Sequence, residues 1–382
     1  MARRTKTDAA AAADSADTSE IAVVRASTFV ELIRQSRIVL CCGTGGVGKT
    51  TAAAAIALAA ADEGRRAVVV TIDPAKRLAD ALGLGVLTNR PVRVELPNTT
   101  GELWALMLDT KATFDDLVRR HAASDAQADR ILVNAFYKNI SGALGGTQEY
   151  MATEKLYELV NEPVDATGDP LGSFDLIVID TPPTRNALDF LSAPERLTRL
   201  LDNRVFRALM APARSGLRVM GAASQLVLRA VGKVIGGEVL ADAVAFFQAF
   251  EGMEAGFRDR AQKVLILLRE PSTSWLLITT PRAEAVEEAV FFGNELRKHG
   301  LSIAGLVANR MYPEFDPLPD AGSSAAVQRA RHGAELASAH QIALQPLASI
   351  VKDAPVAQVP LAPEDLHELS SLETIAAVFR AS

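Results

Sequence analysis

A glycine-rich stretch that ends in a lysine and two threonines has the composition of a phosphate-binding loop. Residues 43–51 read Gly-Thr-Gly-Gly-Val-Gly-Lys-Thr-Thr, which contains the pattern Gly-x-x-x-x-Gly-Lys-Ser/Thr. Glycines let the backbone wrap closely around phosphates, so that successive N–H groups point at the anion. In this pattern Lys49 reaches the β- and γ-phosphates as a catalytic cation, and the hydroxyl of Thr50 binds Mg²⁺. The stretch predicts a nucleotide site made of Gly43, Thr44, Gly45, Gly46, Val47, Gly48, Lys49, Thr50 and Thr51.

Three polar residues elsewhere follow short apolar runs and could complete such a site. Asp180 comes directly after Leu-Ile-Val-Ile, an arrangement that places a carboxylate near Mg²⁺, which we expect it to bind through water. Asp73 ends another apolar run and could orient or deprotonate the attacking water. The amide of Asn309 can donate to and accept from an adenine edge. Each also has a simpler interpretation, because a strand-end aspartate often caps a helix and an asparagine often occupies a turn.

Apolar runs that alternate with helical stretches predict the elements that position these residues. We expect strands at 37–42, 67–72, 103–108, 175–179, 275–280 and 303–308, and a further one at 342–347. A helix at 28–34 precedes the first strand, and another follows the glycine loop as far as Ala61. Strands that are apolar throughout indicate a parallel sheet whose two faces are both covered by helices.

Two intervals interrupt this alternation with helical patterns. The first, 113–160, predicts helices around the turn Gly-Ala-Leu-Gly-Gly at 142–146. The second, 194–260, has no strand signal. Its apolar residues follow helical spacing, first at Leu197, Leu200, Leu201 and Val205 and later in one helix with Phe246, Phe250, Met253 and Phe257. We expect a helical subdomain built from about 112–165 and 194–262, within a domain that spans 26–382.

The composition argues against several classes of protein. Lys and Arg number 40 against 46 Asp and Glu, and this net charge of −6 does not suit a nucleic-acid-binding protein that relies on bulk positive charge. The two cysteines, Cys41 and Cys42, are neighbours in a predicted strand and point to opposite faces, so neither a disulfide nor a metal site is expected. No stretch reaches the roughly 20 apolar residues that cross a bilayer. We expect a disordered tail at 1–25 and a cytoplasmic protein.

Together these motifs resemble the arsenical-pump-driving ATPase family, which includes the guided-entry ATPases that deliver tail-anchored membrane proteins. The resemblance rests on residues 45–51, Asp73-Pro74-Ala75, Asp180-Thr181 with Pro183-Thr184, and Asn309-Arg310. It implies an α/β P-loop NTPase fold with a deviant Walker A loop (the SIMIBI type), a mostly parallel sheet and a helical subdomain. It also implies a dimeric ATPase that uses ATP and Mg²⁺, with switch residues at Asp73 and Asp180 and an adenine contact at Asn309. The helices beside the ATPase core would open or close a groove for a client.

Several residues depart from the pattern of this family. The second loop residue is normally a lysine that reaches the partner's nucleotide across the dimer, whereas here it is the uncharged Thr44. Such a cation contributes several powers of ten to phosphoryl-transfer rates. Lys76, Arg77, Arg185 and Asn186 stand where the family more often has His, Ser or Asn, Gly and His, and the arsenite- and zinc-binding cysteines are missing. One member of the paired actinobacterial ATPases of this family also has a threonine in the loop, and this chain resembles that member, whose partner retains the lysine.

Three functions follow from the motifs and the resemblance. The first is an ATPase that couples its nucleotide state to an apolar client or a membrane-protein partner, as one subunit of a heterodimer with a lysine-bearing paralogue or as a homodimer. The second is a nucleotide-binding regulatory subunit that hydrolyses ATP poorly until the paralogue activates it. The third, an arsenite-type pump subunit, is disfavoured because the thiolate ligands are missing. The apolar helices between Leu197 and Phe257 could capture a client or simply bury one another.

Overall fold

The computed structural model describes residues 28–73, 77–97, 99–140, 147–165, 168–182, 189–202, 237–313, 325–362 and 369–382. Several expectations therefore lie outside the described residues. They concern the tail at 1–25, the turn at 142–146, and the part of the second helical interval at 203–236, which includes Val205. They also concern the family positions Pro74, Ala75, Lys76, Pro183, Thr184, Arg185 and Asn186.

An eight-stranded sheet forms the centre of the molecule. Its order is β3-β4-β2-β5-β1-β6-β7-β8, and each neighbouring pair is parallel except β3 and β4. The strands are β1 (Ile38–Cys42), β2 (Arg66–Thr71), β3 (Val92–Val94), β4 (Glu102–Met107), β5 (Leu176–Asp180), β6 (Thr273–Thr279), β7 (Ile303–Met311) and β8 (Val356–Pro360). The mostly parallel sheet and six of the predicted strands are confirmed, with bounds that differ by three residues at most.

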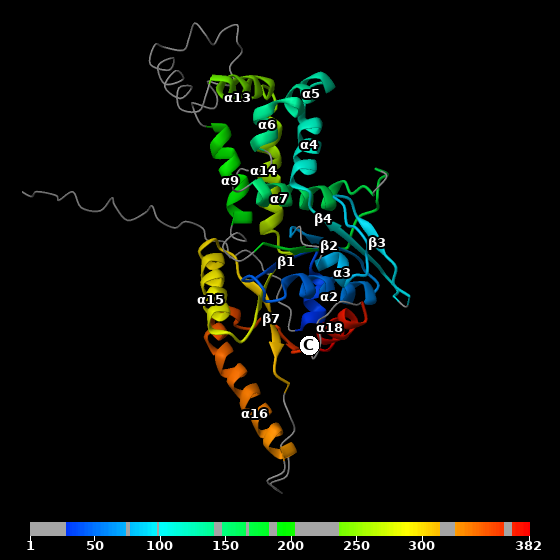
Figure 1. Ribbon diagram of the computed structural model, residues 1–382, viewed down its shortest axis with the longest axis vertical. Coiled ribbons are helices and arrows are strands. Elements are labelled where there is room, and N and C mark those ends of the chain that lie inside the picture. Colours follow the sequence, from blue (N-terminus) through cyan, green and yellow to red (C-terminus); the bar gives the residue numbers. More distant parts are fainter. Residues whose placement is uncertain are drawn as a thin grey trace, which may run out of the picture.

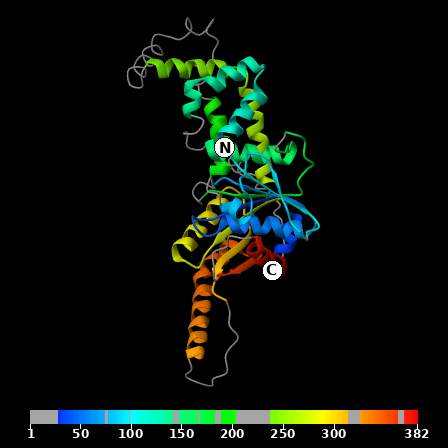
Figure 2. The same ribbon diagram turned by 45° about the vertical axis from the view of Figure 1, so that its right-hand side comes forward.

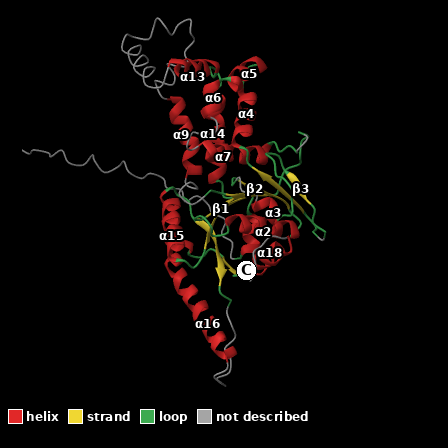
Figure 3. Ribbon diagram, in the orientation of Figure 1, coloured by secondary structure: helices red, strands yellow, loops and turns green. Residues whose placement is uncertain are grey.

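Helices cover both faces of the sheet, as the apolar strands predict. The central strands β1, β5 and β6 are buried along their whole length, so their side chains need cover on both sides. One face packs against α1 (Phe29–Gln35), α2 (Lys49–Asp62), α3 (Arg77–Ala81) and α18 (Leu369–Ala381). The other packs against α7 (Thr147–Asn161), α14 (Glu254–Arg269), α15 (Ala283–Lys298) and α17 (Ala348–Val351). Figure 3 shows helices on either side of the strands.

The prediction of a strand at 342–347 is wrong. These residues belong to the end of the long helix α16 (Ala325–Leu344) and to a 3-10 turn at Gln345–Leu347. Ile342 is 62% exposed, so this apolar run does not enter the core of the sheet. The sequence pattern also misses β8, an edge strand whose residues alternate between exposed and buried. One proline directly precedes this strand and another is its last residue, so it does not read as an apolar run. Figure 2 shows α16 projecting from one end of the molecule.

A group of helices stands at the opposite end, as Figure 1 shows. It consists of α4 (Thr110–His121), α5 (Asp125–Val133), α6 (Ala135–Ile140), α7, α9 (Asp189–Asp202), α13 (Gly237–Ala249) and α14. These helices share a core that includes Tyr137, Phe246, Phe250 and Phe257. Both intervals predicted to be helical contribute to the group, while their division into a separate subdomain stays a prediction. No helix in the described ranges is long and apolar enough to span a membrane.

The single helix expected around Phe246 and Phe257 is in fact two helices. α13 ends at Ala249 and α14 begins at Glu254. Gly252 between them has a φ of +87°, a left-handed conformation that favours glycine. The apolar spacing hides this break because the aromatic rings still meet: the centroid of Phe250 lies 5.9 Å from that of Phe246 and 4.8 Å from that of Phe257.

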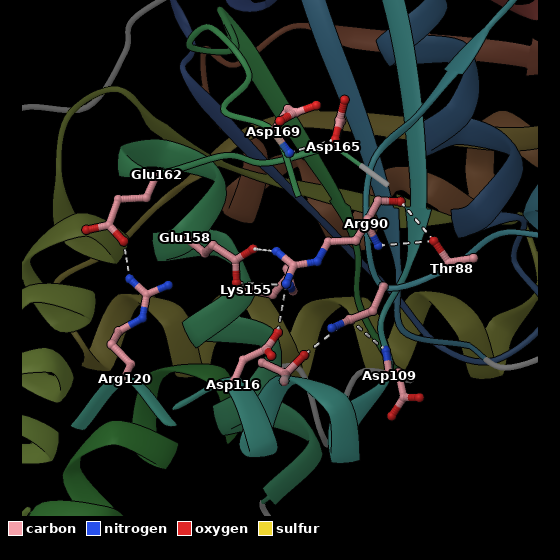
Figure 4. Close-up of polar contacts among 12 residues, drawn as sticks. Thr88, Arg90, Asp109, Asp116, Arg120, Lys155, Glu158, Glu162, Asp165 and Asp169 are labelled. Atoms are coloured by element: carbon pink, nitrogen blue, oxygen red, sulfur yellow. Dashed lines mark hydrogen bonds and ion pairs between the residues drawn. The ribbon is translucent and has the colours of Figure 1, made fainter. Parts of the chain in front are cut away.

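A polar network joins these helices to the edge of the sheet. Arg90, just before β3, contacts Asp116 of α4 at 3.2 Å and Glu158 of α7 at 3.3 Å (Figure 4). The fully buried Lys155 donates to the other carboxylate oxygen of Glu158 at 2.9 Å. Burial lowers the pKa of Lys155, and Glu158 opposes this shift. Buried charges are tolerated only when paired, so the buried pair of Lys155 and Glu158 is stabilised, and Arg90 connects it to α4 through the partly exposed Asp116.

Candidate phosphate-binding site

The glycine loop lies between the end of β1 and the start of α2, at the carboxyl edge of the sheet, where α/β folds bind their ligands. Gly46 and Gly48 have φ angles of +79° and +91°, which glycine adopts without strain. Gly43 is required for space, because a Cβ there would lie 2.1 Å from the backbone oxygen of Ile278 in β6. The N-terminus of α2 follows directly at Lys49, and the positive end of a helix dipole attracts anions.

Lys49 places a positive charge against this loop. Its Nζ donates to the backbone oxygens of Gly43 and Thr44, both at 2.9 Å, and the residue is buried. An ammonium has three donors, so one remains for a phosphate oxygen. Burial lowers the pKa of Lys49, and Asp180 is the main group that opposes the shift.

Asp180 and two hydroxyl groups form a cluster beside Lys49. β5 lies between β1 and β2, which places Asp180 opposite Cys41 and Thr71. The Oδ2 atom of Asp180 accepts hydrogen bonds from Thr50 Oγ1 at 2.6 Å and Thr71 Oγ1 at 3.0 Å. Burial raises the pKa of Asp180, and these hydrogen bonds together with Lys49 oppose the shift.

The cluster fits a Mg²⁺ ion that is bound together with a nucleotide. Hydroxyl and carboxylate oxygens are suitable Mg²⁺ ligands, and the ion usually completes its shell with phosphate oxygens and water. Within the described residues, no three His, Cys, Asp or Glu side chains are grouped as a metal site. Thr50 and Asp180 therefore suit a metal that arrives with phosphate groups rather than one held by protein ligands alone.

Asp73 lies just beyond the end of β2, near Asp180. Its backbone N–H donates to Thr71 Oγ1 at 3.2 Å, and its carboxylate forms an ion pair with Arg77 at 3.3 Å. The carboxylate is partly exposed, so water can reach it. Arg77 is one of the residues that depart from the family pattern, and its partner in this chain is the proposed switch aspartate.

Gln148, at the start of α7, is a neighbour that the sequence does not single out. Its Nε2 donates to the backbone oxygen of Ile72 at 3.2 Å, one residue before Asp73. No motif surrounds Gln148, so only the fold brings it to this place. α7 belongs to the group of helices at the end of the molecule opposite α16. Gln148 therefore connects the backbone next to Asp73 to that group.

Two cavities flank the glycine loop. The inner cavity, about 620 Å³, is lined by Lys49, Thr50, Asp73, Asp180 and Gln148, among others. The outer cavity, about 840 Å³, is lined by Thr44 and by one side of α15 with Glu284, Glu287, Glu288 and Phe291. Gly45, Gly46 and Arg310 line both cavities. The predicted lysine, metal-side residues and switch aspartate thus come together in the inner cavity.

Asn309, near the end of β7, contacts the glycine loop. Its Nδ2 donates to the backbone oxygen of Val47 at 2.7 Å, and its Oδ1 accepts the N–H of Arg310 at 2.9 Å. A Cβ at Gly48 would lie 2.2 Å from the same Nδ2. Asn309 therefore buttresses the loop, while one amide hydrogen and one oxygen lone pair stay available. Its predicted contact with adenine stays a prediction.

The parallel sheet, the glycine loop between β1 and α2, and the lysine at the helix start define a P-loop protein of the nucleotide-binding class. A sequence model of the family described as "Anion-transporting ATPase" matches residues 36–381. The chain belongs to this family, which agrees with the resemblance found in its motifs.

Curated relatives support this assignment at low identity. The chain is 25% identical to the ATPase GET3B of Arabidopsis thaliana over 71% of this chain and 63% of that protein. It is 26% identical to the ATPase GET3C of the same plant, over 76% and 71% of the two chains. It is 28% identical to the ATPase ARSA2 of Chlamydomonas reinhardtii, over 71% and 67%. The chain thus spans less than two thirds of GET3B, so activity and partners are matters for proposal.

Proposed function

We propose that this protein binds and hydrolyses ATP with Mg²⁺ and couples its nucleotide state to an apolar client or a membrane-protein partner. The observation that carries the proposal is the inner cavity, in which Lys49, Thr50, Asp180 and Asp73 surround one glycine loop. Membership of a family of ATPases supports the same activity.

Each side chain has a separate role in this proposal. The loop N–H groups and Lys49 bind the phosphates and balance the charge that develops during transfer. Thr50 and, through water, Asp180 would hold Mg²⁺, which would help to neutralise the negative charge of the phosphate groups. Asp73 orients the attacking water and accepts its proton. Asn309 holds the loop and uses its remaining hydrogen-bonding capacity for adenine.

The active assembly is a dimer, and a paralogous subunit supplies the lysine that Thr44 replaces. Thr44 lines the outer cavity but brings no charge to it. Three acidic residues line the same cavity, namely Glu284, Glu287 and Glu288. Their negative charge would attract a lysine that enters this cavity from a partner subunit. A homodimer would place Thr44 at both sites and leave both without that cation.

The client is proposed to bind the group of helices at the end of the molecule opposite α16. Gln148, in the first turn of α7, lines the inner cavity, and Glu154 of the same helix accepts a hydrogen bond from Arg260 of α14 at 2.7 Å. A shift near Asp73 can therefore reach the far helices through one continuous element. Nucleotide-dependent crosslinking of a transmembrane-segment peptide near Phe250 tests this role. A complete lack of crosslinking in every nucleotide state would mean that these aromatic residues only bury one another.

Asp73→Asn tests the catalytic proposal. We expect the variant to bind ATP like the original chain but to lose turnover, because the amide cannot accept the proton of the attacking water. Asp125→Asn, in the first turn of α5, is the matched control and should leave both quantities unchanged. Turnover that survives in Asp73→Asn would remove Asp73 from the mechanism.

The alternative function is a subunit that binds nucleotide but hydrolyses it poorly, and Thr44 is the residue that favours it. Sedimentation of the chain with and without its lysine-bearing paralogue separates the two functions. A stable homodimer with high turnover would exclude the alternative. Thr44→Lys should raise the turnover of the chain alone if the missing cation limits it.

A further inference from the structure

Arg310, near the end of β7, has a backbone conformation that arginine rarely adopts. Its φ is +58°, in the left-handed region that is unfavourable for non-glycine residues. Lys352 is the other non-glycine residue with positive φ in the described ranges, and it caps the C-terminus of α17. Arg310 lies inside a strand, so no helix end accounts for its conformation.

The conformation of Arg310 coincides with an irregularity in the sheet. The register between β7 and β8 shifts between Ala308 and Met311. Asn309 fastens this irregularity to the glycine loop, since its amide joins the N–H of Arg310 to the backbone oxygen of Val47. Irregularities of this kind occur beside active sites, where they re-aim a side chain, and strained residues gather at such sites.

The side chain that is re-aimed in this way reaches the rim of both cavities. Arg310 is exposed and lines the inner and the outer cavity together with Gly45 and Gly46. Arg77, in the inner cavity, is neutralised by Asp73. By contrast, the guanidinium of Arg310 has no ion-pair or hydrogen-bond partner in the described part of the chain. An unpaired guanidinium beside a phosphate-binding loop points to an anionic ligand.

We propose that Arg310 binds the phosphate groups of the nucleotide held by its own chain, and so supplies at the rim of the site positive charge that Thr44 does not. This assignment rests on the proposed nucleotide-binding function. A guanidinium presents a planar fork of N–H donors that matches phosphate oxygens and forms strong, charge-assisted hydrogen bonds. A glycine would relieve the backbone at this position, but it would lose the phosphate contact.

Titration calorimetry of the full chain with ATP and ADP tests the assignment. We expect Arg310→Gln to weaken binding by about 10–100-fold, the loss typical of a charge-assisted contact, and Arg310→Lys to weaken it less. Arg282→Gln is the matched control, because Arg282 lines only the outer cavity and should retain binding within about twofold. A loss for ATP alone would place the contact at the γ-phosphate, and an equal loss for both nucleotides would place it nearer the α- and β-phosphates.

Arg310→Gly separates a binding role from a structural one. We expect it to bind nucleotide as weakly as Arg310→Gln, yet to melt about 2 °C higher than the original chain because the backbone strain is gone. If Arg310→Gln binds within twofold of the original chain, or Arg282→Gln loses as much affinity, the assignment is wrong while the proposed function stands. If the original chain binds neither nucleotide, both are wrong.

Discussion

Gly43→Ala should displace the glycine loop, because the new methyl group would have no room. Its Cβ would lie 2.1 Å from the backbone oxygen of Ile278, whereas real Cβ contacts are not shorter than 3.0 Å, so a gap of about 0.9 Å must open. Backbone cannot give way as a flexible side chain does, and β1 and β6 are neighbours in the centre of the sheet. Overpacking of this kind costs about 3 kcal/mol, or about 5 °C in melting temperature. A shift of about 1 Å at the loop would lower turnover by about 100-fold.

Gly45→Ala provides the control within the same loop. A Cβ at Gly45 meets nothing within 4 Å, and its φ is not positive. This variant should therefore unfold at the same temperature as the original chain when no nucleotide is added. Thermal unfolding followed by circular dichroism compares the two variants directly. Equal melting temperatures for Gly43→Ala and Gly45→Ala would refute the packing argument.

Three further predictions concern ionisable groups that are buried or half-buried. Asp180→Asn should still bind ATP, but Mg²⁺ should no longer add to the stabilisation that ATP gives. In thermal unfolding, the original chain should be more stable with ATP and Mg²⁺ than with ATP and a chelator. This difference can reach about 2.7 kcal/mol when the ligand is present at 100 times its Kd. An undiminished Mg²⁺ effect would contradict the role of Asp180. Burial and the neighbouring Arg260 lower the pKa of His121 below 6.5, so the unfolded chain binds a proton there more readily, and the free energy of unfolding should fall as the pH drops below that value. His121→Gln should flatten this dependence in urea titrations, and an unchanged slope would count against it. Glu154→Gln should lower the free energy of unfolding by about 3 kcal/mol, because it leaves the buried Arg260 without its carboxylate partner. Replacing Glu154 by Leu and Arg260 by Met together should lower it by less in the same urea titrations. A larger loss of stability in the double variant would contradict this reasoning.

The phosphate loop and the central strands could be predicted because their signals are local. The glycine loop is a fixed pattern, and the apolar runs of β1, β2 and β5 are long enough to exclude most alternatives. The aspartates at 73 and 180 could be brought together for the same reason, since the carboxyl ends of parallel strands meet at one edge.

The rest depends on contacts between distant parts of the chain. The apolar run at 342–347 reads like a buried strand, but periodicity alone does not separate a short strand from the end of a helix. The break at Gly252 is hidden because aromatic spacing continues across it. Gln148 carries no motif, and the motif Asn309-Arg310 does not reveal the left-handed backbone of Arg310. Only the meeting of α7 and β7 with the glycine loop gives these two features a place in the site.

The most direct test of the proposed ATPase is phosphate release from an equimolar mixture of this chain and a lysine-bearing paralogue. We expect steady release that requires Mg²⁺, exceeds the sum of the separate proteins, and stops when this chain carries Asp73→Asn. Release that is the same with Asp73→Asn, or an absence of both ATP binding and release, would contradict the account.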